Sequence, residues 1–158
     1  MTGEAPTATV ASVAGYSVAL DRAYDGRGHL WVLRLPNDGV RLGMDPLGVE
    51  TTGTVAHVAL ADVGTVLGAG DALGTVEAEK FVGPLATPLS GVVVARNDAV
   101  VGDPEALYRD PFGAGWLVEL APADLEAEWP DLVAGAERIV AWFAGEVERY
   151  RRDGVLAE

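Results

Sequence analysis

The stretch EAEKFVGPLATPLSG, residues 77–91, contains Lys80, the only lysine of the chain. A strand-like run ends at Glu77, just before this lysine, and the next predicted strand begins after Pro88. A Gly-Pro pair interrupts the connection between the two strands, as is typical of turns. We therefore expect Lys80 to lie on a protruding turn, where its side chain is accessible to a modifying enzyme.

Lysine and arginine differ in the chemistry that they offer. Of the 11 Lys and Arg residues, one is Lys80 and the other ten are arginine. A guanidinium stays protonated and is a poor nucleophile, whereas a lysine amine can be acylated. A single surface lysine can also persist by chance, but its place on a turn favours a chemical role. We predict that Lys80 is a covalent attachment point.

Short apolar runs separated by glycine and proline predict a β-rich domain. Asp38-Gly39 lies between two of these runs and is a β-hairpin signal. Strands so short and so closely spaced are typical of a small antiparallel sandwich or barrel. The strand-like runs are Leu30–Leu35, Val40–Met44, Val55–Leu60, Ala72–Glu77, Val92–Ala95 and Trp116–Leu120.

The C-terminal part of the chain has a helical period instead. Apolar residues recur there at intervals of three and four, with arginines near the end and Gly154 beyond it. This pattern predicts an amphipathic helix that packs on the β core or, alternatively, docks a partner. The apolar positions are Leu132, Ala136, Ile139, Phe143, Val147 and Tyr150.

Length and composition restrict the function further. The chain has 158 residues, 24 acidic against 11 basic side chains, and a formal charge of −13. This charge repels nucleic acid and anionic membranes and favours solubility or steering toward basic partner surfaces. No apolar run reaches the roughly 18 residues of a membrane span, and residues 1–15 contain no Lys or Arg of a targeting signal. We expect a cytoplasmic monomer.

Enzymatic and metal sites are difficult to assemble from this sequence. Only two histidines, His29 and His57, and three serines are present, so no nucleophile and base pair is evident. Both histidines lie in strand-like runs and are interpreted as core or sheet-surface residues rather than metal ligands. Because the chain has no cysteine, any redox sulfur must come from a cofactor. We predict a non-catalytic protein without a metal site.

The segment around Lys80 resembles the lipoylation segment of glycine-cleavage H proteins. The run DPFGAGWL, residues 110–117, resembles a second signature of that family and is more specific than a lysine turn. The resemblance covers roughly residues 24–124, without a gap between Val40 and Leu117. Further matching positions are His29-Leu30-Trp31-Val32, Val40–Gly43, Gly53–Leu60, Asn97 and Asp103-Pro104-Glu105.

This resemblance implies a mostly β fold, a flattened lipoyl-domain sandwich or barrel-sandwich hybrid with a C-terminal amphipathic helix, and lipoate in amide linkage to Lys80. It also implies that Glu77, Gly64 and Gly91 help modifying enzymes to recognise and shape the turn, although ordinary turn and strand roles are the alternative. Biotin carriers share the architecture but have Met-Lys-Met, whereas Glu79 and Phe81 flank the lysine here. Lipoate is therefore favoured over biotin.

The implied function is that of a carrier that shuttles an aminomethyl intermediate among the P, T and L proteins of glycine cleavage after modification by lipoate ligase or lipoyl transferase. The segment after the lysine, residues 81–84, departs from the small, polar residues usual in that family. An H-like lipoate-binding protein of bacterial sulfur oxidation, serving a heterodisulfide-reductase-like complex, is therefore an alternative, and a lipoyl-relay or structural module is a third.

The expected organisation has three parts. Residues 1–15 are predicted to form a flexible N-terminal tail, because they show no helical or strand period. Residues 16–124 are predicted to form the lipoyl-carrier domain. Residues 125–158 are predicted to form a helical extension packed on that domain.

Overall fold

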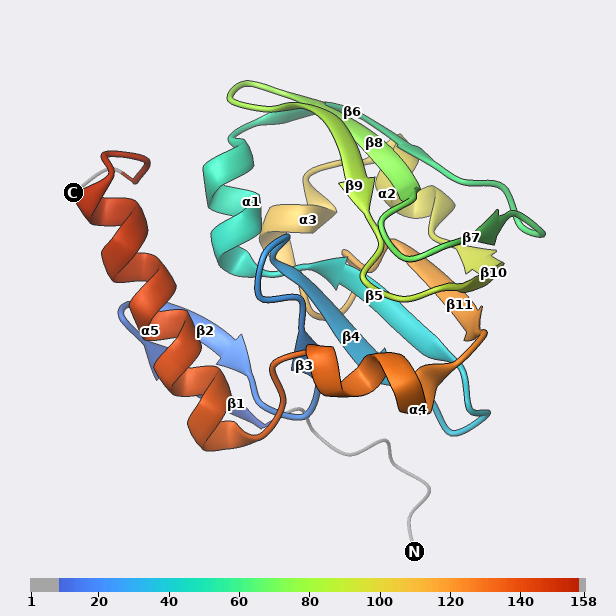
Figure 1. Cartoon of the computed structure of the whole chain (residues 1–158). Coiled ribbons are helices and arrows are strands. Elements are labelled where there is room, and N and C mark those ends of the chain that lie inside the picture. Colours follow the sequence, from blue (N-terminus) through green and yellow to red (C-terminus); the bar gives the residue numbers. More distant parts are fainter. Residues whose placement is uncertain (1–8, 157–158) are drawn as a thin grey trace, which may run out of the picture.

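The computed structural model describes residues 9–156, and its main body is two antiparallel sheets (Figure 1). Both sheets contribute to one apolar core and they do not close into a barrel, so the predicted flattened sandwich is confirmed. The larger sheet has the order β3(Ala23–Tyr24), β4(Leu30–Arg34), β5(Val40–Met44), β11(Val118–Pro122), β10(Gly91–Arg96), β7(Val66–Leu67). The smaller sheet has the order β6(Val55–Leu60), β8(Ala72–Ala78), β9(Val82–Ala86).

Alternation along the strands places the core between the two sheets. In β10, Val93 is fully buried, whereas Val92 and Val94 on either side are exposed, because successive side chains of a strand point to opposite faces. Leu73 and Val76 of β8 enter the same core from the smaller sheet. The sandwich is thus held together by apolar side chains of strands whose pattern is visible in the sequence.

The β4–β5 hairpin forms where the Asp-Gly signal predicts it. Asp38 adopts the left-handed conformation with φ of 66°, and the Leu35 amide donates to the Gly39 carbonyl at 2.8 Å. The strand after Lys80, however, begins at Val82 and not after Pro88. Pro84 lies within this strand, opposite Thr75. Because β9 is the edge strand of its sheet, the missing N–H of the proline is tolerated.

Short helices join the strands. Helix α1(Pro46–Thr52) is capped by Asp45, whose Oδ1 accepts from the Gly48 amide at 2.9 Å. An aspartate followed by proline at the first helical position is a recognised helix start. The other short helices are α2(Asp98–Gly102), α3(Ala106–Arg109), α4(Leu125–Glu128) and the 3-10 helix η1(Trp129–Asp131).

The predicted C-terminal helix is present as α5(Ala136–Arg152). It begins four residues later than the apolar pattern, because Gly135 with φ of 90° and the preceding 3-10 turn interrupt the helical backbone. It ends at Arg152, and the expected glycine, Gly154, follows just beyond the end with φ of 75°. Across residues 9–156, no helix combines the length and the apolar character that a membrane crossing requires.

Part of the predicted N-terminal tail is a strand. Residues 1–8 lie outside the described part of the chain, but β1(Val10–Val13) pairs with β2(Tyr16–Ala19) in a separate two-stranded sheet. Val13 and Val18 are buried in a second apolar cluster together with Phe143 of α5. The boundary predicted at residue 15 therefore differs from the structure, because the helix covers this hairpin.

The second cluster leads to a stability prediction. Phe143 is fully buried, and its ring lies 5.6 Å from that of Tyr16 in an edge-to-face arrangement. We expect Phe143→Ala to lower the free energy of unfolding by about 3–5 kcal/mol, the usual cost of removing a buried phenylalanine. Urea unfolding measures this change. The matched control Val140→Ala, on the exposed side of the same helix, is expected to change it by no more than about 0.5 kcal/mol; equal losses would contradict the packing described.

Candidate functional site

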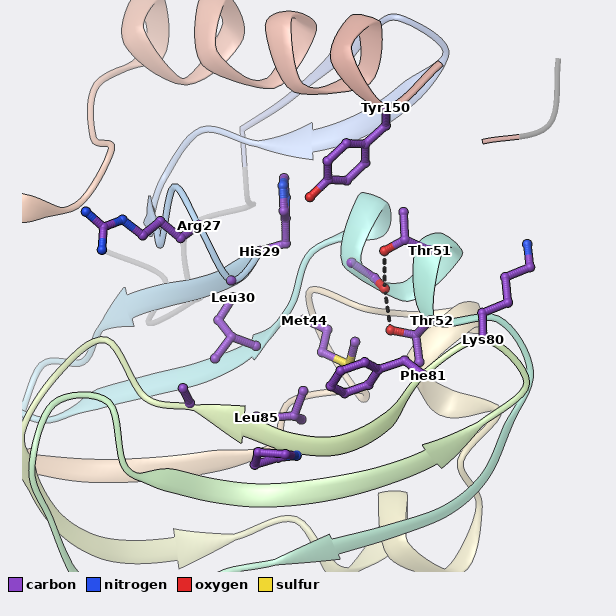
Figure 2. A pocket seen from close by; sticks show the side chains of 14 residues that line it. Arg27, His29, Leu30, Met44, Thr51, Thr52, Lys80, Phe81, Leu85 and Tyr150 are labelled. Carbon is purple, nitrogen blue, oxygen red and sulfur yellow. Dashed lines mark hydrogen bonds between the residues drawn. The ribbon is translucent and has the colours of Figure 1, made fainter. Parts of the chain in front are cut away.

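Lys80 lies at the tip of the β8–β9 hairpin. The Ala78 amide donates to the Phe81 carbonyl at 2.9 Å and closes the turn. The Lys80 amide donates to the Thr52 carbonyl at 3.0 Å, which fixes the tip against the end of α1. The Lys80 side chain is exposed and extends away from the neighbouring ring of Phe81 (Figure 2). The backbone is thus held while the amine stays free, as an attachment point requires.

A cavity of about 350 Å³ lies beside Lys80 and is lined in part by its side chain. Leu30, Met44, Phe81 and Leu85 gather on one side of it, and His29 and Tyr150 approach from the side of α5 (Figure 2). The volume falls within the range of small-molecule pockets. The site therefore combines an accessible amine with an adjacent, largely apolar pocket.

His29 connects the large sheet, α1 and α5. It is 3% exposed, and its Nδ1 lies 2.8 Å from Oδ2 of Asp45, while its Nε2 lies 3.0 Å from Oε1 of Glu146 on α5. The imidazole stacks on the indole of Trp142 at 5.2 Å. Arg149 donates to both carboxylate oxygens of Glu146 at 2.9 and 2.8 Å. These contacts fix α5 at the edge of the cavity.

The two carboxylates determine the charge of His29. Burial alone would lower the pKa of His29, but the hydrogen bond and charge of Asp45, followed by those of Glu146, outweigh burial and raise the pKa. Burial also disfavours an ionised Glu146, yet the hydrogen bonds from Arg149 and His29 lower the pKa of that carboxyl. The two carboxyl groups therefore favour the protonated form of the imidazole that lies between them.

The other predicted site residues do not all lie near Lys80. Glu77 is exposed on β8, paired with Val82 across the same hairpin. Gly64 and Gly91 belong to the β7–β10 region, on the opposite side of the domain from the hairpin tip (Figure 1). Gly64 has φ of 96°, and a Cβ on Gly91 would lie 2.5 Å from the Ala121 carbonyl oxygen. These two glycines shape the sheet and not the turn itself.

Sequence reasoning did not identify Asp45, Glu146 or Tyr150 as parts of the site. The Asp45-Pro46 pair carries a helix-start signal, so the capping role of Asp45 was available from the sequence. Glu146 and Tyr150 reach the site only because α5 packs back on the domain. No local pattern indicates that contact. Both histidines were interpreted as core or sheet-surface residues: His29 is buried, and His57 is exposed on β6.

Comparisons with known proteins agree with this arrangement. The sequence model of the family described as glycine cleavage H-protein matches residues 22–141. The glycine cleavage system H protein of Mycolicibacterium smegmatis is 45% identical over 92 residues, which are 58% of this chain and 70% of that protein. The corresponding protein of Mycobacterium leprae is 40% identical over 99 residues, 63% of this chain and 75% of that protein.

A solved structure is also similar. The crystal structure of a glycine cleavage system H protein from Mycobacterium marinum superimposes with a TM-score of 0.62 and 37% sequence identity. The match covers 67% of this chain and 87% of that chain.

The raised pKa of His29 leads to a prediction of pH dependence. Because the folded state holds the proton more tightly than the unfolded chain, the stability from this proton is present below the unfolded pKa of about 6.5. It is lost as the pH rises through the folded pKa. We expect the free energy of unfolding to fall as the pH is raised above about 6.5, as measured by urea unfolding at several pH values.

Two variants test whether His29 causes this slope of the free energy of unfolding against pH. His29→Gln is expected to remove it, whereas His57→Gln, at the exposed histidine, is expected to retain it. A slope that disappears in His57→Gln and persists in His29→Gln would contradict the assignment.

Proposed function

The chain belongs to the glycine cleavage H-protein family, and we propose that it is a lipoyl carrier with lipoate attached through an amide to Nζ of Lys80. The observation that carries this proposal is the hairpin tip. Its backbone is bound to α1 through the Lys80 amide, while the side chain is exposed. The family match of residues 22–141 includes this tip.

The residues at the hairpin tip are suited to carry a lipoyl group. When bound, the lipoyl disulfide would supply the redox sulfur that this cysteine-free chain lacks and would accept the aminomethyl unit of glycine cleavage. Lys80 provides the acylable amine, and the bound tip limits the motion of the attachment point. Covalent attachment lets one arm present the cargo to successive active sites, which raises the effective concentration of the cargo at each site. The contribution of the chain is therefore positioning.

The chain itself is proposed to be non-catalytic. His29 is the histidine beside Lys80, but both of its ring nitrogens face carboxylates and its side chain is buried. It is therefore not placed to act as a general base on a substrate. The P, T and L proteins would carry out the chemistry, and a lipoate ligase or lipoyl transferase would load the arm. The sulfur-oxidation alternative is not favoured, because the family and relatives described above are those of glycine cleavage.

Lys80→Arg tests the attachment. The variant keeps the positive charge but removes the acylable amine, so we expect an unchanged fold and no modification. Incubation with lipoate ligase, ATP and lipoate, followed by intact mass measurement, is expected to add one lipoyl mass to the natural chain and none to the variant. The modified protein is further expected to support exchange of labelled bicarbonate into glycine by P protein. Lipoylation of the variant, or no modification of the natural chain, would contradict the proposal.

Glu77 is proposed to be a contact for the enzyme that attaches lipoate. It is exposed on the strand that leads into the tip, so its carboxylate is available to a partner. We expect Glu77→Gln to slow lipoylation about tenfold, which corresponds to the loss of one charged contact of about 1.4 kcal/mol. The matched control Glu79→Gln changes another exposed carboxylate of the same hairpin and is expected to have a smaller effect. Equal rates for Glu77→Gln and the natural chain, from mass spectra taken over time, would exclude this contact.

A further inference from the structure

The outer face of the large sheet, which points away from the core, carries exposed valines at its β7 end. Val66 of β7 is 76% exposed and lies directly opposite Val92 of β10, which is 36% exposed. Val94 of β10 and Val63, in the turn before β7, are also exposed. These four residues form the valine surface. Single exposed apolar side chains are ordinary, but a group of them on one face is typical of an interaction surface.

The core does not require these exposed valines. Val93 fills the core position of β10 and is fully buried between Val92 and Val94, and Leu67 fills the core position of β7. Because successive side chains of a strand alternate between the two faces, the exposed valines point outward. Threonine favours strands as valine does and suits water better. Strand formation alone therefore does not explain an apolar outer face.

The strand β7 also presents a backbone edge, because it is the last strand of its sheet. The Val93 amide donates to the Thr65 carbonyl at 2.9 Å, and Leu67 lies opposite Gly91. Antiparallel strands alternate between positions that bond to the neighbouring strand and positions that do not. The N–H and C=O of Val66 therefore point away from β10. Such an edge can accept an extended segment of another protein, which is a recurring mode of peptide recognition.

Three rim aspartates make the surroundings of the valine surface negative. Asp62 and Asp71 lie before and after β7, and Asp98 follows β10. The side chains of Asp62 and Asp98 are 91% and 73% exposed, and both pair with the same arginine, Arg96, at 3.1 and 2.7 Å. Three carboxylates around one arginine leave a negative rim. Two copies of this chain, each with a charge of −13, would repel each other here, so the rim favours a positively charged partner.

We propose that the valine surface docks an extended, basic segment of a partner protein. The segment pairs with the β7 edge, packs aliphatic side chains against Val66 and Val92, and places lysine or arginine beside the rim aspartates. The surface lies on the opposite side of the domain from the hairpin tip (Figure 1). A docked partner therefore leaves Lys80 accessible, so that one protein can hold this chain while another reaches the lysine.

Two peptides of opposite charge test the docking on the full chain. The probe is a short peptide with blocked ends that alternates lysine and valine, and the control has glutamate in place of lysine. In ¹⁵N-labelled protein we expect the amide resonances of Val66 and Val92 to shift with the lysine peptide and to stay in place with the glutamate peptide. Added salt is expected to weaken the binding, because salt screens the rim aspartates. Equal shifts with both peptides, or no shift with the lysine peptide, would overturn the proposal.

Variants separate docking at this surface from a general attraction of a basic peptide to an acidic chain. The double variant Val66→Thr with Val92→Thr removes two apolar methyl groups and is expected to weaken binding of the lysine peptide about tenfold. The control Val10→Thr changes an exposed valine of β1 and is expected to bind normally. Asp71→Asn is expected to weaken binding about threefold, whereas Asp38→Asn, at the exposed β4–β5 turn, is not. Equal losses in variants and controls would overturn the proposal.

Other occupants of the valine surface give different results. A dimer in sedimentation equilibrium that is lost in the double variant would identify a second copy as the occupant, and sedimentation with phosphatidylcholine vesicles would identify a membrane. We expect neither, and either would overturn the proposal. Lipoylation of Lys80 is expected to proceed at the same rate with the lysine peptide bound, and a slower rate would contradict a separate docking surface. Because peptide binding is measured on the unmodified chain, its failure is distinguishable from a failure of lipoate attachment.

Discussion

The buried carboxylate of Asp45 is the point on which the site depends. One of its oxygens accepts from the Gly48 amide and begins α1, and the other holds the imidazole of His29. The far end of α1 accepts from the Lys80 amide through the Thr52 carbonyl, and the other side of the imidazole binds Glu146 on α5. A single side chain therefore links the hairpin tip to the C-terminal helix. A fully buried carboxylate is tolerated because each oxygen has a partner.

Much of this architecture can be predicted from the sequence because it follows local patterns. The Asp38 turn, the strands on either side of it and the apolar face of α5 all depend on residues that are close in the chain. Lys80 was predicted to be the attachment point because a primary amine is chemically distinct from the arginines elsewhere, and the structure places it on an exposed hairpin tip. In these places local preference and tertiary structure agree.

The remainder depends on contacts between distant segments. The start of β9 was missed because Pro84 reads as a turn residue, and only the edge position of the strand makes it acceptable. The strand β1 has no clear pattern of its own and is formed where α5 covers it. The lining of the cavity comes from separate segments, including Leu30, Phe81 and Tyr150, so no window of sequence contains it.

The family match ends at residue 141, inside α5, whereas Tyr150, which lines the cavity, and Trp142 and Glu146, which contact the lining residue His29, lie beyond that point. One wall of the pocket is therefore supplied by a segment appended to the shared domain. Changes in this appendage can alter the pocket while the lysine hairpin and the sandwich stay as they are. The surroundings of Lys80 are thus set in part by residues after 141, independently of the β domain that the family match covers.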